Sequence, residues 1–235
     1  MRHWQGERLP ARRVDALTDA FRRRTVAIHE TGAAQYADRM SLPFPLARAL
    51  SILGHPILVL PMVVLAIAWV RGDAHTALWS AAGFAVFAAL VMGYSWWQVH
   101  RGRWGHVDAS ATHERSTLNR FLLVALTAGA LLVAWRGGQP LFALGLALSA
   151  AMILTAMLTA RWCKLSLHLA FIVFAACLLR ELGLAWMLVA LSFAAAVAWS
   201  RLALQRHTRR DLMVGAITGA SAGLAFWPLA SRWTG

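Results

Sequence analysis

The chain has 235 residues, of which 59% are hydrophobic and only 14% charged, and its mean hydropathy is +0.56. Because an average soluble domain carries about 25% charged residues, a soluble globular protein is excluded. Several apolar runs are long enough to cross the roughly 30 Å of bilayer hydrocarbon, which predicts an all-α, polytopic membrane helix bundle. The formal net charge of +13 indicates, in so apolar a chain, contact with anionic lipids or anionic substrates rather than with nucleic acid.

A basic N-terminal segment at residues 1–47 precedes an integral membrane domain at residues 48–235. The first 40 residues lack a short apolar core with a small-residue cleavage site, so we expect no cleavable signal peptide and a cytoplasmic N-terminus. Val14, Leu17 and Phe21 recur at helical spacing among arginines, which is typical of an amphipathic helix on an anionic leaflet. A mobile tail that only retains the N-terminus in the cytosol is the equal alternative.

Hydropathy and the polar breaks between apolar runs predict six to seven transmembrane helices, with seven favoured. The runs lie at residues 50–70, 76–98, 120–135, 140–160, 165–180, 183–200 and 211–229. Tryptophans near the ends of these runs are typical of an aromatic belt. They are Trp69, Trp96, Trp97, Trp135, Trp162, Trp199 and Trp227. In the last run, Gly215, Gly219 and Gly223 favour close packing against a neighbouring helix.

The positive charges are unequally divided between the two sides of a seven-helix arrangement. The N-terminal segment through Arg48 and the second, fourth and sixth connections hold 19 of the 23 basic residues. Because positive residues mark the cytoplasmic side, we predict a multi-pass protein of the inner cell membrane with these three connections in the cytoplasm. The same connections hold most of the remaining His, Asp and Glu, so a polar site is expected where they meet the membrane surface.

The sixth connection carries the strongest candidates for chemistry: Ser200 and Arg201, followed by His207 and Asp211. If a helix begins at Thr208, His207 and Asp211 lie four residues apart on one face, so the carboxylate can hold one imidazole nitrogen and leave the other free to attack. Arg201 is a forked donor suited to phosphate oxygens. A loop that is basic only because it faces the cytoplasm is the alternative interpretation of this run.

Further candidates lie in the other two connections. Ser166 and His168 follow Lys164, the only lysine in the chain, whose compact charge suits either phosphate or a snorkelling position at the interface. In the second connection, Arg115 stands seven positions after Asp108. Three polar clusters on one side of the membrane favour a single shared site over coincidence.

Together these stretches resemble the three signatures of the type 2 phosphatidic acid phosphatase superfamily, which also includes vanadium haloperoxidases. The third signature (Ser-Arg, five residues, His, three residues, Asp) is complete. Ser166 and His168 match the second, Pro-Ser-Gly-His, and Arg115 matches the first, Lys, six residues, Arg-Pro. The resemblance covers roughly residues 100–225. The chain departs from the signatures at Asp108 for lysine, Ser116 for proline, Leu165 for proline and Leu167 for glycine.

The resemblance implies a membrane phosphatase of lipid phosphates or polyprenyl (di)phosphates. His207 would attack phosphorus to form a phosphohistidine, Asp211 would orient it, and His168 would protonate the leaving group and later activate water. The phosphate-binding residues it implies are Arg115, Arg201, Ser166, Lys164 and, by orienting one of these cations, Asp108. Because arginines supply the positive charge, neither a metal nor another cofactor is expected. The expected partners are a phosphorylated lipid and a bilayer with anionic lipids.

Three other protein classes compete with this prediction. A non-catalytic membrane protein of the same fold, which binds a phosphorylated lipid or a partner, is the alternative that the four departures favour. A small transporter is disfavoured because the predicted spans are nearly free of charge at mid-depth. A membrane prenyltransferase is excluded, since it would need aspartate-rich loops to carry magnesium. Phosphatidic acid, phosphatidylglycerol phosphate and polyprenyl (di)phosphates all remain candidate substrates.

Overall fold

The computed structural model describes residues 43–107, 109, 111–137 and 139–234, and all regular structure within them is helical. The chain divides into two compact units, Met1–Leu46 and Ala47–Gly235, and the helix bundle belongs to the second. The amphipathic helix predicted around Leu17 lies outside the described residues, and so does Asp108.

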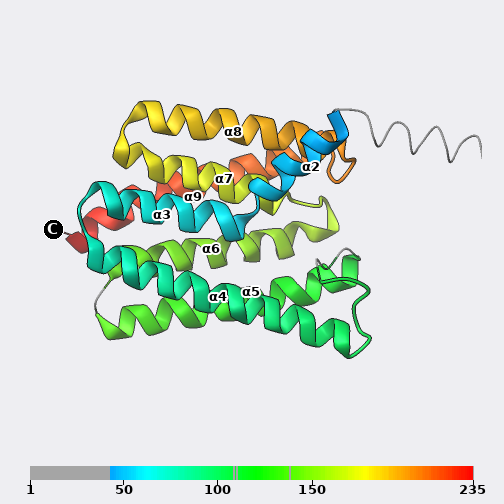
Figure 1. Ribbon diagram of the computed structural model, residues 1–235, viewed down its shortest axis with the longest axis horizontal. Helices are drawn as coiled ribbons and strands as arrows, with labels where there is room; N and C mark the ends of the chain where they lie inside the picture. Colours follow the sequence, from blue (N-terminus) through cyan, green and yellow to red (C-terminus); the bar gives the residue numbers. More distant parts are fainter. Residues whose placement is uncertain (1–42, 108, 110, 138, 235) are drawn as a thin grey trace, which may run out of the picture. The chain divides into compact units, whose positions relative to one another are not determined.

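Beyond the bent pair at its start, the helices of the bundle alternate in direction along the chain (Figure 1). They are α2 (Pro43–Leu53), α3 (Pro56–Val70), α4 (Ala74–His100), α5 (Thr112–Arg136), α6 (Pro140–Leu158), η1 (Thr159–Arg161), α7 (Leu167–Leu178), η2 (Leu179–Leu182), α8 (Leu184–Ala203) and α9 (Arg209–Thr234). Figure 1 places the connections before α5, α7 and α9 at one end of the bundle, hereafter the polar-loop end. The three polar connections thus lie together, as predicted, and the membrane side that they face stays a prediction.

Five helices are long and apolar enough to cross a bilayer: α4, α5, α6 continued through η1, α8 and α9. Helices α2 and α3, bent by 54° at the break between them, pass the same test as a pair. The described residues therefore contain five to six candidate spans. Their outer faces carry large exposed apolar side chains, such as Met62, Val124 and Leu224, which is compatible with a membrane-embedded protein.

The fifth predicted span, at residues 165–180, is not confirmed as a full-length crossing. Helix α7 has 12 residues, whereas about 20 are needed to cross the hydrocarbon core. It packs against α3, α6, α8 and α9, and nearly all of its side chains are buried, with Ile172 and Phe174 each 1% exposed. Apolar residues on every face are typical of such a central helix. Hydropathy alone does not separate it from a lipid-facing span.

The contact between α7 and α9 depends on the glycines of α9. A Cβ atom added at Gly219 would lie 2.1 Å from the carbonyl oxygen of Ala170, and one at Gly215 would lie 2.6 Å from that of Ser166. Both distances are shorter than any van der Waals contact, so only glycine permits this approach. The predicted close packing is confirmed, and it brings the first turn of α9 beside the start of α7.

Most of the predicted belt tryptophans are exposed near helix ends. Trp69 at the end of α3 is 83% exposed, and Trp135 at the end of α5 is 80% exposed. Trp227 differs, because its ring packs at 5.4 Å from that of Phe226 and its Nε1–H donates to the carbonyl of Cys177 at 3.4 Å. Trp227 therefore packs between helices, because the glycines of α9 bring this helix close enough to α7 for the indole of Trp227 to reach it.

Candidate active site

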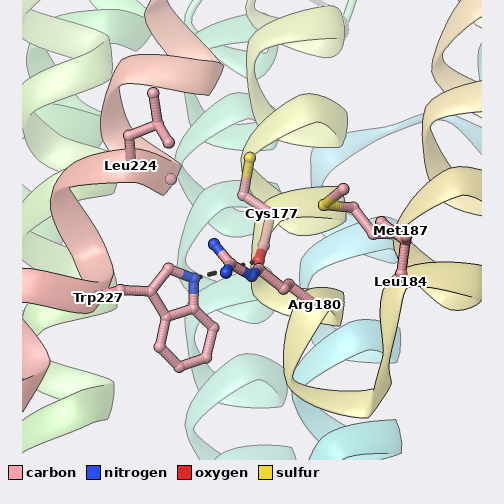
Figure 2. A pocket seen from close by; sticks show the side chains of 7 residues that line it. Cys177, Arg180, Leu184, Met187, Leu224 and Trp227 are labelled. Atoms are coloured by element: carbon pink, nitrogen blue, oxygen red, sulfur yellow. Dashed lines mark hydrogen bonds between the residues drawn. The ribbon is translucent and has the colours of Figure 1, made fainter.

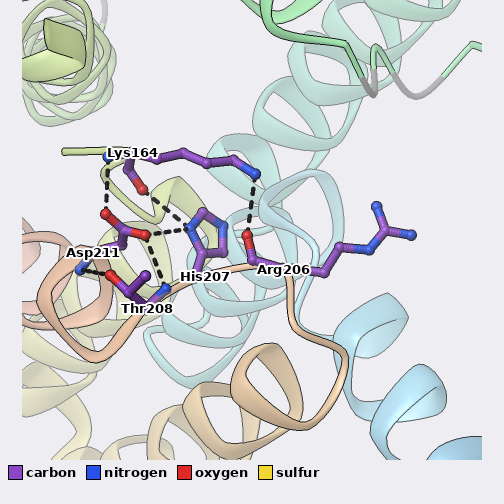
Figure 3. Close-up of polar contacts among 5 residues, drawn as sticks. All are labelled: Lys164, Arg206, His207, Thr208 and Asp211. Atoms are coloured by element: carbon purple, nitrogen blue, oxygen red, sulfur yellow. Dashed lines mark hydrogen bonds and ion pairs between the residues drawn. The ribbon is translucent and has the colours of Figure 1, made fainter.

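The start of α9 is built around the carboxylate of Asp211 (Figure 3). Asp211 Oδ2 accepts from the Thr208 N–H at 2.9 Å, and the Thr208 hydroxyl accepts from the Asp211 N–H at 3.3 Å. This reciprocal pair is a capping box, which explains why the helix begins after Thr208. The other oxygen, Oδ1, accepts from the Lys164 N–H at 2.9 Å. Asp211 thus ties the loop before α7 to the loop before α9.

His207 lies in the connection just before α9, and its Nδ1 is 3.0 Å from the carbonyl oxygen of Lys164. A carbonyl oxygen only accepts, so Nδ1 carries the proton and Nε2 keeps its lone pair. The carboxylate of Asp211 lies 3.9 Å from Nδ1, beyond hydrogen-bonding distance. The hydrogen bond expected from Asp211 is therefore made by the Lys164 carbonyl, because the Asp211 carboxylate accepts from the N–H groups of Lys164 and Thr208 instead.

The surroundings of His207 favour its neutral form. Burial, and then the positive charges of Arg201 and Lys164, lower the pKa of His207 from 6.5 to about 4. Burial, followed by the charges of Arg115 and Arg201, also lowers the pKa of Lys164. The Lys164 ammonium donates to the Arg206 carbonyl at 3.1 Å, which joins the loop before α7 to the residue that precedes His207. At neutral pH His207 is an uncharged imidazole within a group of cations.

Two of the predicted phosphate-binding residues have buried polar atoms without partners. Ser166 is fully buried, and its Oγ has no hydrogen-bond partner among the described residues. Nε of Arg201 is also buried without a hydrogen-bond partner among the described residues. Nη1 of Arg201 donates to the hydroxyl of Ser51 at 2.7 Å. A buried donor without a partner costs about 1–3 kcal/mol, so such atoms are typical of a site completed by a ligand.

The α2–α3 break contributes residues that sequence reasoning missed. The ring of His55 packs edge-to-face against that of His168, with centroids 5.0 Å apart. Ser51, one turn earlier, holds Arg201. No sequence pattern links His55 to residues more than 100 positions away. The only sequence signal was the His-Pro pair at a helix start, where the histidine side chain caps α3.

Arg115 lies in the first turn of α5, and its Nη2 donates to the Thr112 hydroxyl at 3.2 Å. Its charge acts on Lys164, so it faces the same group of residues. The buried carboxylate of Glu114 accepts from the N–H groups of Gly105 at 2.7 Å and Ala111 at 2.8 Å, which folds the preceding loop onto the helix. Glu114 is a positioning residue that sequence reasoning missed, although its place three residues after Ala111 is typical of a helix cap.

The described residues bring Lys164, Ser166, His168, Arg201, His207 and Asp211 together at the polar-loop end, with Arg115 at their edge. Among the described residues, no three His, Cys, Asp or Glu side chains form a group that could hold a metal ion. A half-open, mostly apolar pocket of about 460 Å³ lies at the opposite end, lined by Arg180, Met187 and Trp227 among others (Figure 2). It contains none of the predicted site residues.

No family model matches this chain, and searches among curated proteins and among solved structures also find no match.

Proposed function

We propose that the protein is a membrane phosphatase that hydrolyses lipid phosphates through a phosphohistidine. One observation carries the proposal: a neutral histidine with a free Nε2 lies within a group of cations that includes a buried arginine nitrogen without a partner. A nucleophile surrounded by unused donors suits a tetrahedral anion, because phosphoryl transfer depends on positioning and on stabilising charge at the equatorial oxygens. The resemblance to the type 2 phosphatidic acid phosphatases, carried by the complete third signature, points to the same chemistry.

The reaction begins with attack by Nε2 of His207 on phosphorus. A P–N bond forms, the P–O bond to the lipid alcohol breaks, and His168 gives its proton to the leaving oxygen. His168 then takes a proton from water, and the resulting hydroxide attacks the phosphohistidine. The P–N bond breaks, inorganic phosphate leaves, and the imidazole returns to its starting state. The carbonyl of Lys164 stabilises the Nδ1 proton throughout, so the charge that develops on the ring stays hydrogen-bonded.

The location of the site supports a lipid as substrate. It lies at one end of a bundle whose outer faces are apolar, so a lipid tail stays in the bilayer while its phosphate reaches Arg201 and Ser166. Phosphatidic acid, phosphatidylglycerol phosphate and polyprenyl diphosphates all satisfy this geometry. The second candidate function is a non-catalytic protein that binds such a headgroup, favoured by the leucines at positions 165 and 167, which flank Ser166.

Phosphate release from these three lipid classes tests the proposal. The detergent-purified protein is assayed with a metal chelator present, beside His207→Ala and, as a matched control, His100→Ala. His100 is an exposed histidine at the end of α4 whose ring stacks on Trp96. We expect release that survives the chelator, persists in His100→Ala and falls at least a thousandfold in His207→Ala, because no other group forms the P–N bond.

Two results would contradict the proposal. Release that the chelator abolishes would show that a metal, not the arginines, supplies the positive charge. No release from any of the three lipids, with binding of at least one of them by calorimetry, would favour the non-catalytic lipid-binding protein.

A further inference from the structure

The break between α2 and α3 is held against the end of α8. Gly54 is buried at this break, and a Cβ atom there would lie 2.7 Å from Cγ2 of Val197 in α8. One turn further along α8, Arg201 donates to Ser51. These two contacts fix the position of His55, the residue after Gly54, relative to Arg201.

His55 lies directly beside the predicted acid–base residue. Its ring meets that of His168 edge-on, with an angle of 88° between the ring planes and 5.0 Å between centroids. His55 is exposed and His168 is partly buried. Because the two rings are in contact, a phosphate bound at His168 lies within reach of His55.

The hydrogen bonding of His55 determines which of its nitrogens carries the proton. Nδ1 accepts from the N–H of Ile57 at 3.3 Å, which caps the start of α3. Because Nδ1 accepts, a neutral His55 carries its proton on Nε2. Among the described residues no hydrogen bond to this Nε2 is made, so the ring presents a free N–H donor next to His168 and Arg201.

We infer that His55 is a substrate-binding residue whose Nε2–H donates a hydrogen bond to a phosphate oxygen of the substrate. The inference rests on the proposed function and extends its site to the α2–α3 break, outside the three signature-like stretches. It adds a neutral donor to the cations, on an exposed residue at the edge of the site.

Two substitutions distinguish phosphate binding by Nε2 of His55 from capping of α3 by its Nδ1. In His55→Asn the amide oxygen takes the place of Nδ1 and keeps the cap, but no donor reaches the position of Nε2. In His55→Gln the longer amide places an N–H near the position of Nε2 and loses the cap. We expect His55→Asn to keep the thermal midpoint and to lower kcat/KM for the preferred lipid phosphate by about tenfold to a hundredfold, as for the loss of a hydrogen bond to a charged group. His55→Gln should lower the midpoint and retain more of kcat/KM.

The matched control is His75→Asn at the opposite end of the bundle, where His75 Nε2 accepts from the Trp79 N–H at 2.8 Å. It should leave kcat/KM unchanged. If His55→Asn matches the wild type in kcat/KM, or exceeds His55→Gln, His55 is a helix cap only and the inference is wrong.

A binding measurement distinguishes failure of the inference from failure of the proposed function. If the wild type hydrolyses nothing, calorimetry with dioctanoyl phosphatidic acid replaces the kinetic assay. Tenfold or greater weakening in His55→Asn would then support His55 as a phosphate ligand in a non-catalytic protein. Equal binding by the two proteins, or no binding by either, would overturn the inference.

Discussion

Asp211 and Lys164 hold different parts of the candidate site in place. Asp211 accepts from two backbone N–H groups in different loops, so its carboxylate holds the loops in place. The Lys164 carbonyl, brought near by that contact, holds the Nδ1–H of His207. Backbone groups thus set the tautomer of His207, while Asp211 acts on it at 3.9 Å through its charge.

The first prediction concerns the titration of His207. Burial and the neighbouring cations lower its pKa to about 4, so we expect the ring to stay neutral at pH 5. In ¹³C-histidine NMR of the detergent-solubilised protein, the imidazole resonance that disappears in His207→Ala should titrate near pH 4. A midpoint near 6.5 would show that the cations do not act on this ring.

The same shift affects stability in a definite direction. The folded pKa lies below the ordinary value of 6.5, so between pH 6.5 and about 4 the unfolded state binds a proton that the folded state excludes. The free energy of unfolding that His207 contributes is present above pH 6.5 and is lost as the pH falls toward 4. In His207→Ala the loss of stability on acidification should be smaller than in the wild type.

At the scale of elements, the α7–α9 pair connects packing to the site. Ser166 precedes α7 and Asp211 lies in the first turn of α9, and the Ser166 N–H donates to the Asp211 carbonyl at 3.2 Å. The glycines of α9 bring the two helices close enough for this bond. Any substitution that separates the helices therefore also moves the residues that hold His207.

Gly219→Ala tests this coupling. The new methyl group would meet the Ala170 carbonyl at 2.1 Å, so we expect α7 and α9 to move apart and the free energy of unfolding to fall by about 1–3 kcal/mol, typical of overpacking. Phosphate release should fall with it. The measurements are denaturant or thermal unfolding in detergent together with the release assay.

Gly145→Ala is the matched control, because Gly145 lies within α6 and no atom stands within 4 Å of its added Cβ. Its stability should be unchanged or slightly raised, since alanine is the better helix former. Equal effects of the two substitutions would argue that the α7–α9 contact is looser than its geometry indicates.

For the whole molecule, the alternating helices gather the three polar connections at one end of the bundle (Figure 1). The three polar connections lie at one end, and the connections near Arg71 and Gly183 lie at the other together with the end of α9 (Figure 1). At this second end, Arg71 forms an ion pair with Glu181, which joins the turn after α3 to η2. The candidate site therefore lies at one end of the bundle only.

The orientation of the bundle yields a topological prediction. Positive residues concentrate at the polar-loop end, so we expect that end in the cytoplasm. An alkaline phosphatase reporter fused after Gly235 should then lie on the other side of the membrane and be active. A matched fusion within the loop at Gln205 should be inactive. Activity at Gln205 with inactivity after Gly235 would reverse the orientation and place the candidate site on the outer face.

Much of the site was predictable because its strongest motif is local. His207 and Asp211 lie four positions apart at the start of a helix, and the parity of the apolar runs places the loops of Ser166 and Arg201 on the same side. His55 was not predictable in this way, because its contact with His168 depends on how α3 packs in the bundle. Asp108 lies outside the described residues, and its predicted role stays a prediction.

The sequence by itself determined the all-helical class, the positions of the long apolar helices and the gathering of polar connections on one side. These follow from hydropathy and from interactions within one helical turn. Only the tertiary structure decided that α7 is a short central helix, that Trp227 packs inward and that the Lys164 carbonyl holds His207. The hydrogen bonds that hold His207 and Trp227 join residues 43 and 50 positions apart. Such contacts depend on helix packing, which no local pattern specifies.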